Sequence, residues 1–136
     1  MTAGRAGCRQ DFEGMTRILI IDDSSFQRRI VTGILSEAGY DVLVADNGRD
    51  GIELAQKDAP DLIITDLLMP EFDGFYLLKE ARAQDLGIPV LVLTSDIQDT
   101  TRDQCMYLGA AGVVNKPVKK EALLQAITRI IPGERI

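Results

Sequence analysis

Four runs of apolar residues that each end in polar side chains constrain the possible fold more than any other feature of this chain. The first run, Ile18 to Ile21, leads directly into Asp22 and Asp23. It is apolar at every position rather than at alternate ones, which is typical of strands buried on both faces of a parallel sheet. Segments with helical spacing of apolar residues separate the runs. The pattern therefore predicts a parallel sheet covered by helices on both sides.

The predicted elements alternate along the chain. After the first strand, a helix begins next to Ser24 or Ser25, either of which can cap it, and ends at Gly39. Five strands alternating with five helices predict a doubly wound α/β domain, but the element order alone leaves the strand order open. The remaining strands are expected at 41–45, 61–66, 88–96 and 112–117, and the remaining helices at 47–60, 73–85, 97–109 and 118–131.

Composition limits the classes of function. The chain has 136 residues, of which 46% are hydrophobic, and this suits one domain with a substantial core. Its formal net charge is −6 without a basic cluster, so we expect no nucleic-acid partner. No apolar run has the length of a membrane span or of a signal-peptide core. Cys8 and Cys105 lack metal-ligand spacing, and the sequence favours a cytoplasmic protein without a disulfide.

The two ends of the chain differ from its middle. Residues 1–14 have little apolar content and no periodicity, and we expect a disordered extension, with Met15 as an alternative start. The folded domain is expected to span 15–131, followed by a short tail at 132–136.

Polar side chains follow four of the predicted strands at the point where each strand ends. In a doubly wound sheet these ends meet along one edge, where ligands bind. We therefore expect three carboxylates, a hydroxyl and an ammonium group to converge there. They belong to Asp22 and Asp23 after the first strand, Asp66 at the third, Thr94 at the fourth and Lys116 at the fifth.

The predicted cluster of oxygen ligands favours a hard divalent cation. The chain has no histidine, and carboxylates without histidine or cysteine suit Mg²⁺, or Mn²⁺, better than Zn²⁺. A cation would offset the repulsion between Asp22 and Asp23. A carboxylate can also become an aspartyl phosphate, and Asp66 is the candidate because it stands alone at its strand end. Lys116 and Thr94 are the kinds of group that stabilise a transferring phosphoryl group.

Each of these residues also has an ordinary structural interpretation. An aspartate at a strand end is commonly a turn former or helix cap, and a lone lysine is commonly a surface residue. Pro117 suits the first position of a helix, and Asp73 with Gly74 suits a turn followed by a cap. These interpretations do not explain why the polar residues select the carboxyl ends of four apolar strands.

Five motifs in order resemble one known family. "IDDSS", "ITDLLMPEFDG", "VLVLTSD", "LGAAG" and "NKP" resemble the receiver domain of two-component response regulators, with its CheY-like, flavodoxin-type fold, from residue 16 to about 131. The resemblance implies strand order 2-1-3-4-5. It also implies a sensor histidine kinase or phosphotransfer protein as the phosphoryl donor, and a downstream protein bound by the surface of segments 97–109, 112–117 and 118–131.

The resemblance further implies a role for each site residue. Asp66 would accept the phosphoryl group, Thr94 would hydrogen-bond it and Lys116 would pair with it. Asp23 would bind Mg²⁺ directly together with Asp66, Asp22 would bind it largely through water, and the backbone carbonyl of Leu68 would be a further ligand. The Lys116–Pro117 peptide bond would be cis, a conformation that is almost confined to proline.

Two positions depart from the family pattern. The family usually carries an aromatic residue, whose rotation couples to the threonine, where this chain has Val113. Valine cannot swing in a comparable way, so we expect either that the fourth helix and its loop carry more of the switching or that the output differs. Leu68 and Asp96 occupy the positions that flank the attacking water in the family, and Leu68 has no polar group to orient it.

Three functions are consistent with the sequence. The leading one is a stand-alone phosphorylatable switch that acts through a partner, because no output domain is expected after Ile131. Within this class, a chemotaxis-type regulator is favoured over a phosphorelay intermediate. Tyr107 and Met106 are candidate partner contacts, although Met106 could equally fill the core. The alternatives are a Mg²⁺-dependent phosphohydrolase that forms an aspartyl phosphate, and a receiver-like adaptor that works without phosphorylation.

Overall fold

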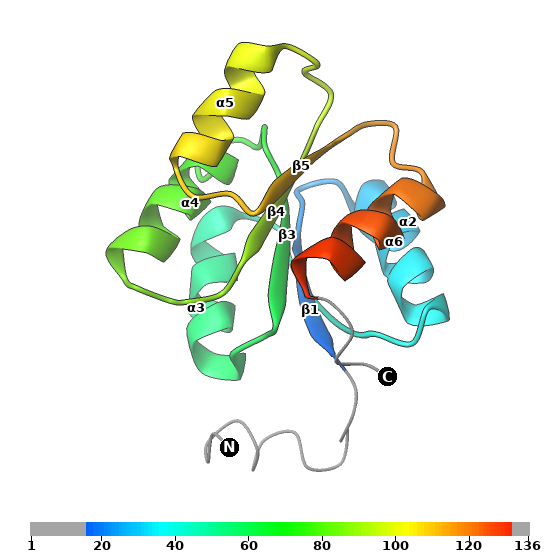
Figure 1. Ribbon diagram of the computed structural model, residues 1–136. Helices are drawn as coiled ribbons and strands as arrows, with labels where there is room; N and C mark the ends of the chain where they lie inside the picture. Colours follow the sequence, from blue (N-terminus) through cyan, green and yellow to red (C-terminus); the bar gives the residue numbers. More distant parts are fainter. Residues whose placement is uncertain (1–15, 132–136) are drawn as a thin grey trace.

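Parallel strands form one sheet in the order β2–β1–β3–β4–β5 in the computed structural model, which describes residues 16–131 (Figure 1). The predictions for 1–14, Met15 and 132–136 lie outside these residues. Within the described range, no helix is long and apolar enough to cross a membrane. The strands are β1 (Arg17–Ile21), β2 (Asp41–Ala45), β3 (Leu62–Asp66), β4 (Val90–Thr94) and β5 (Gly112–Asn115). The helices are α2 (Ser25–Glu37), α3 (Gly48–Asp58), α4 (Gly74–Ala83), α5 (Asp99–Tyr107) and α6 (Lys120–Ile130).

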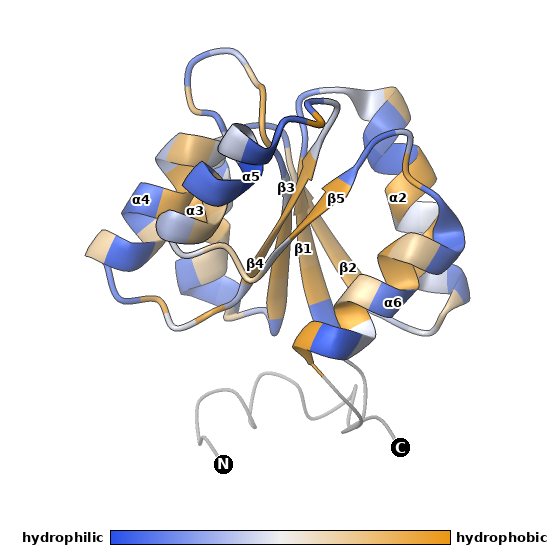
Figure 2. Ribbon diagram, turned by 45° about the horizontal axis from the view of Figure 1, so that its top comes forward, coloured by the Kyte–Doolittle hydropathy of each residue, from blue (hydrophilic) through white to orange (hydrophobic). Residues whose placement is uncertain are grey.

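Two layers of helices bury the two faces of the sheet. Helices α3, α4 and α5 cover one face, and α2 and α6 cover the other (Figure 1). Along β1, Leu19 and Ile21 point into the first core while Ile18 and Ile20 point into the second. Figure 2 shows the strands as largely hydrophobic, with hydrophilic ends, between helices with hydrophilic outer faces. Burial on both sides therefore explains why the strand sequences do not alternate.

Capping side chains set where α2, α3 and α4 begin. Ser24, rather than Ser25, caps α2, because its hydroxyl accepts a hydrogen bond from the Gln27 amide at 3.2 Å. Asn47 caps α3 and Asp73 caps α4 in the same way, which confirms the turn-and-cap interpretation of Asp73. Gly39 follows α2 with a φ of +96°, a conformation that glycine adopts without strain.

Pro117 does not start a helix, contrary to that prediction. Helix α6 begins at Lys120 with Lys119 as its N-cap, so Pro117 lies in the turn that joins β5 to α6. The Lys116–Pro117 peptide bond is cis, as the resemblance implied.

The register of the strands brings their polar ends level. Ile21 pairs with Thr65, Asp66 pairs with Leu93, and Thr94 pairs with Asn115. Because all strands run parallel, the residues that follow them emerge at one side of the sheet, which we call the carboxyl edge. The polar residues picked out from the sequence therefore meet there.

Candidate functional site

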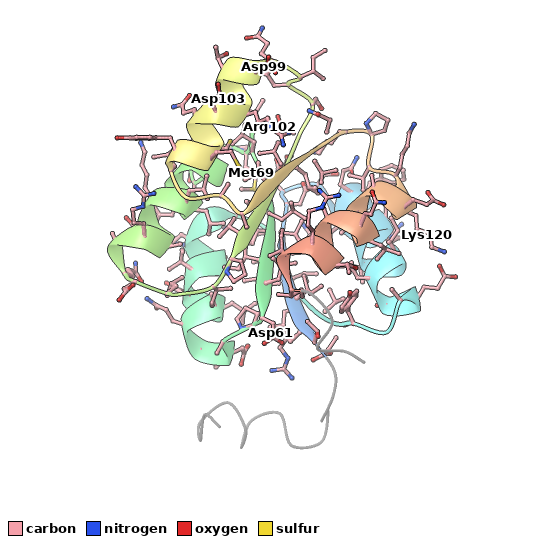
Figure 3. All side chains as sticks on the ribbon, viewed as in Figure 1. Asp61, Met69, Asp99, Arg102, Asp103 and Lys120 are labelled. Carbon is pink, nitrogen blue, oxygen red and sulfur yellow. The ribbon has the colours of Figure 1, made fainter. Side chains whose placement is uncertain are left out.

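Three aspartates form a cluster at the carboxyl edge. Asp22, Asp23 and Asp66 each offer a carboxylate oxygen, and these oxygens lie within 4.8 Å of one another. The residues Asp22 and Asp66 are 3% and 8% exposed, whereas Asp23 is open to solvent. In Figure 3 the labelled Met69, in the loop after β3, marks this side of the sheet, and Asp61 marks the opposite end. Such a set of oxygens, buried on one side and open on the other, suits a hydrated divalent cation.

The turn that carries Asp22 and Asp23 is fixed by the start of α2. The Ser24 amide donates to Asp22 Oδ1 at 2.9 Å, and Arg28 Nη1 donates to the Asp22 carbonyl at 2.6 Å. The Asp22 amide donates to the Ala45 carbonyl of β2 at 3.1 Å. The backbone at Asp22 is therefore held by α2 on one side and by β2 on the other before any ligand binds.

The environment of Asp22 disfavours its charged form. Burial raises the pKa of its carboxyl group from the usual 3.8, and this outweighs the hydrogen bond from the Ser24 amide, which lowers it. The carboxylates of Asp66 and Asp23 raise the pKa further, while the Lys116 ammonium lowers it. A divalent cation among the three carboxylates would reverse this preference.

Lys116 forms an ion pair with Asp66. Its Nζ atom lies 2.7 Å from Asp66 Oδ1, and both side chains are largely buried. The Lys116 amide also donates to the Thr94 carbonyl at 2.8 Å, which ties the turn after β5 to the end of β4. Three carboxylates and one ammonium leave a formal charge of −2, which a divalent cation would neutralise.

Thr94 and Leu68 complete the predicted set. Thr94 ends β4, is buried, and its Oγ1 accepts a hydrogen bond from the Asp96 amide at 3.0 Å. Leu68 lies in the loop after β3 and is 66% exposed. Its side chain has no ligand atom, so the backbone carbonyl is the candidate ligand. The amide of Leu67 next to it donates to the Leu93 carbonyl at 2.9 Å.

Two residues that support the site were not predicted from the sequence. Arg28, which holds the Asp22 carbonyl, lies within a helix where an arginine carries no distinguishing pattern. Gly74 was interpreted only as part of a turn. A Cβ atom at Gly74 would lie 2.9 Å from both the Asp66 carbonyl oxygen and the Leu67 Cα. The start of α4 therefore packs directly against the backbone of the candidate phospho-acceptor.

Replacing Gly74 with alanine should displace this backbone. We expect Gly74→Ala to lower the free energy of unfolding by roughly 1–3 kcal/mol, because the added methyl group meets main-chain atoms. Gly33→Ala in α2 is the matched control, since nothing lies within 4 Å of its Cβ position and alanine favours a helix by roughly 0.5–1 kcal/mol. Urea unfolding should therefore give shifts of opposite sign. Equal shifts would contradict the close packing at Gly74.

The positions that depart from the family pattern have definite environments. Val113 is half-buried on β5 and packs against the core beneath α5. Asp96 directs its carboxylate towards α5, and the hydrogen bond from the Thr101 hydroxyl, followed by the one from the Gln98 amide, lowers its pKa. Met106 is 42% exposed and Tyr107 is 79% exposed, so the interpretation of Met106 as core filling is wrong.

Comparisons with known proteins agree with this geometry. The model of the family described as the response regulator receiver domain matches residues 18–128. Protein PilH of Pseudomonas aeruginosa is 36% identical over 121 residues, which cover 88% of this chain and 100% of PilH. Chemotaxis protein CheY of Bacillus subtilis is 32% identical over 116 residues, which cover 85% of this chain and 97% of CheY.

A solved structure of a related protein has the same fold. The structure of chemotaxis response regulator CheY4 of Vibrio cholerae superimposes with a TM-score of 0.80 at 36% identity, covering 85% of this chain and 98% of CheY4. The strand order 2-1-3-4-5 and the five helices are thus confirmed as a CheY-like, flavodoxin-type fold. With the acidic cluster and its lysine in place and the family match spanning most of the sequence, the chain belongs to the response regulator receiver domains, the signalling domains of two-component systems.

Proposed function

We propose that Asp66 is the phospho-acceptor of this receiver domain and that the domain signals through phosphorylation-dependent contact with another protein. The observation that carries the proposal is the placement of Asp66, whose carboxylate is clustered with two others and paired with the ammonium of Lys116. The donor would be a phosphohistidine on a sensor histidine kinase or a phosphotransfer protein, the partners with which receiver domains interact. The setting would be the cytoplasm, without a nucleic-acid or membrane partner.

The residues present fit a Mg²⁺ ion, with Mn²⁺ as a substitute. Asp23, Asp66 and the carbonyl of Leu68 would bind it directly, and Asp22 largely through water. When bound, the cation would neutralise charge on the carboxylates and on the incoming phosphoryl group. Receiver domains as a family bind Mg²⁺ at this acidic pocket, and the oxygen-only cluster of this chain supports the same assignment.

The side chains supply the remaining steps. A carboxylate oxygen of Asp66 would attack phosphorus as the bond from phosphorus to the histidine nitrogen breaks, and the histidine would leave with that electron pair. In the unphosphorylated domain the Lys116 ammonium pairs with Asp66 Oδ1. Because its four-carbon stem is flexible, the ammonium could pair with a phosphoryl oxygen after transfer. Thr94 would donate its hydroxyl hydrogen to a phosphoryl oxygen.

The proposed output surface comprises α5, β5 and α6. Two exposed apolar side chains flank α5, Ile97 in the turn before it and Tyr107 at its last residue, and they support a protein partner at this helix. A chemotaxis-type role, rather than a relay, is supported by the likeness to chemotaxis protein CheY of Bacillus subtilis, 97% of whose length is covered.

Chemical phosphorylation tests the proposal. Incubation with Mg²⁺ and acetyl phosphate or phosphoramidate should give one phosphoryl adduct, stable to mild acid and labile to base, by intact mass spectrometry. Chelation of Mg²⁺ should abolish it, because the uncompensated carboxylates repel the phosphoryl anion. An adduct formed equally well in chelator would contradict the proposed site. Continuous release of phosphate from a generic phosphomonoester would instead favour the phosphohydrolase alternative.

A further inference from the structure

Asp96 joins three parts of the molecule through four hydrogen bonds. Its amide donates to Thr94 Oγ1 at 3.0 Å, which connects it to the site. Its carbonyl accepts from Asn115 Nδ2 at 3.2 Å, which connects it to β5. Its carboxylate accepts from the Gln98 amide at 2.9 Å and from the Thr101 hydroxyl at 2.6 Å, which connects it to the start of α5.

This arrangement is more than a helix cap. Gln98 is the N-cap of α5 and makes no side-chain capping bond, and the carboxylate of Asp96 instead binds the Gln98 amide and the Thr101 hydroxyl. Capping alone requires neither the bond to Thr94 nor the bond to Asn115. Asp96 thus places the turn between β4 and α5 in a conformation that aims its own amide at the Thr94 hydroxyl.

Helix α5 is also the element that can respond to a small shift of this turn. Cys105 is its only buried residue, whereas α3, with which it shares a face of the sheet, buries four. Figure 2 shows α5 as largely hydrophilic, and Asp99, Arg102 and Asp103, which are labelled in Figure 3, are all exposed. Few buried apolar contacts mean that displacement of the helix costs little free energy.

We propose that Asp96 is a positioning residue that holds the Thr94 hydroxyl in the unphosphorylated domain and transmits its movement to α5. The inference rests on the proposed function, in which Thr94 turns towards a phosphoryl group on Asp66. A hydroxyl that moves in that way leaves the Asp96 amide. Because the carboxylate of Asp96 remains bonded to Thr101, the turn and the first turn of α5 move together.

This route accounts for switching with valine at position 113. Val113 is half-buried and cannot change its exposure by rotation of a ring. The bonds of Asp96 run instead along the backbone from the end of β4 to α5, past the exposed Ile97. The surface that changes is therefore predicted to be the turn at 95–98 together with α5.

Amide chemical shifts in the presence and absence of beryllofluoride with Mg²⁺ test the inference. Beryllofluoride mimics a phosphoryl group on a carboxylate. In the wild-type domain we expect shifts both at the carboxyl edge, around Asp66, and along α5. Thr101→Val removes the hydroxyl that binds Asp96, so the shifts around Asp66 should persist while those along α5 fall at least twofold.

Two controls separate coupling from general damage. Thr100→Val makes the same change one residue earlier at an exposed position, and its shifts should match the wild type. Asp96→Ala should uncouple α5 as Thr101→Val does, whereas Asp99→Ala, at an exposed acid on the same helix, should not. Undiminished shifts along α5 in both Thr101→Val and Asp96→Ala would overturn the inference alone. Failure of the wild-type domain to bind beryllofluoride would overturn the proposed function, and the inference with it.

Discussion

Asp66→Asn is expected to abolish the phosphoryl adduct formed from acetyl phosphate. The amide cannot form the acyl phosphate that the carboxylate forms, and it removes the partner of the Lys116 ammonium. The other carboxylates should not substitute for it. Asp22 is buried with one carboxylate oxygen bound to the Ser24 amide, and Lys116 pairs with Asp66. Intact mass spectrometry of wild type and variant, treated side by side, measures the effect.

Asp46→Asn is the matched control for this variant. Asp46 follows β2 at the same edge of the sheet, is exposed, and is not among the three clustered carboxylates. The control should therefore be phosphorylated as the wild type is. Labelling of Asp66→Asn at the wild-type yield would show that another residue is the acceptor.

Asp22→Asn is expected to have opposite effects on stability and on metal binding. Its carboxylate is buried beside two others, and the asparagine amide oxygen can still accept the bond from the Ser24 amide. Without metal the variant should be more stable at neutral pH, by roughly 0.5–2 kcal/mol, the range of a typical stabilising substitution. Its Mg²⁺ affinity should fall by about 10- to 100-fold, the usual cost of losing an outer-sphere partner.

The pH dependence of stability tests the same carboxyl group. Because the folded pKa of Asp22 is raised above 3.8, the folded chain holds this proton at pH values where the unfolded chain has lost it. Its contribution in the metal-free domain is therefore full at low pH and declines as the pH rises from about 3.8 through the raised pKa. Urea unfolding of wild type and Asp22→Asn across this range should show the variant gaining stability relative to wild type as the pH rises. A constant difference would contradict the raised pKa.

The sequence predicted the sheet and the edge where the site lies because the apolar pattern of each strand matches the way the strand is buried in the fold. Ile18 to Ile21 are apolar throughout because both faces of β1 are covered, and the parallel register then brings Asp22, Asp66 and Thr94 to one edge. Short, continuously apolar runs separated by helices are compatible with few folds other than a parallel sheet covered on both faces. The strand order, by contrast, came from the family resemblance, because the alternation of strands and helices is the same for several orders.

The sequence was less informative about the residues that hold the site in place. Pro117 suits a helix start by local preference, but the turn after β5 places it three residues before α6. Arg28 and Gly74 support the site through contacts with backbone atoms of Asp22 and Asp66, which no side-chain pattern encodes. The bonds of Asp96 to both Thr94 and Thr101 likewise depend on the conformation of a turn.

The central claim is that the three carboxylates form a divalent-cation site that includes Asp66. A titration of the metal-free domain with Mg²⁺, followed by the amide signals of residues 22–24 and 66–68, tests it most directly. We predict saturable shifts confined to these segments, absent from a variant with Asp23→Asn, whose exposed carboxylate closes the cluster towards solvent. Shifts that do not saturate, or that are unchanged in the variant, would show that the carboxyl edge does not hold the ion and would contradict the account.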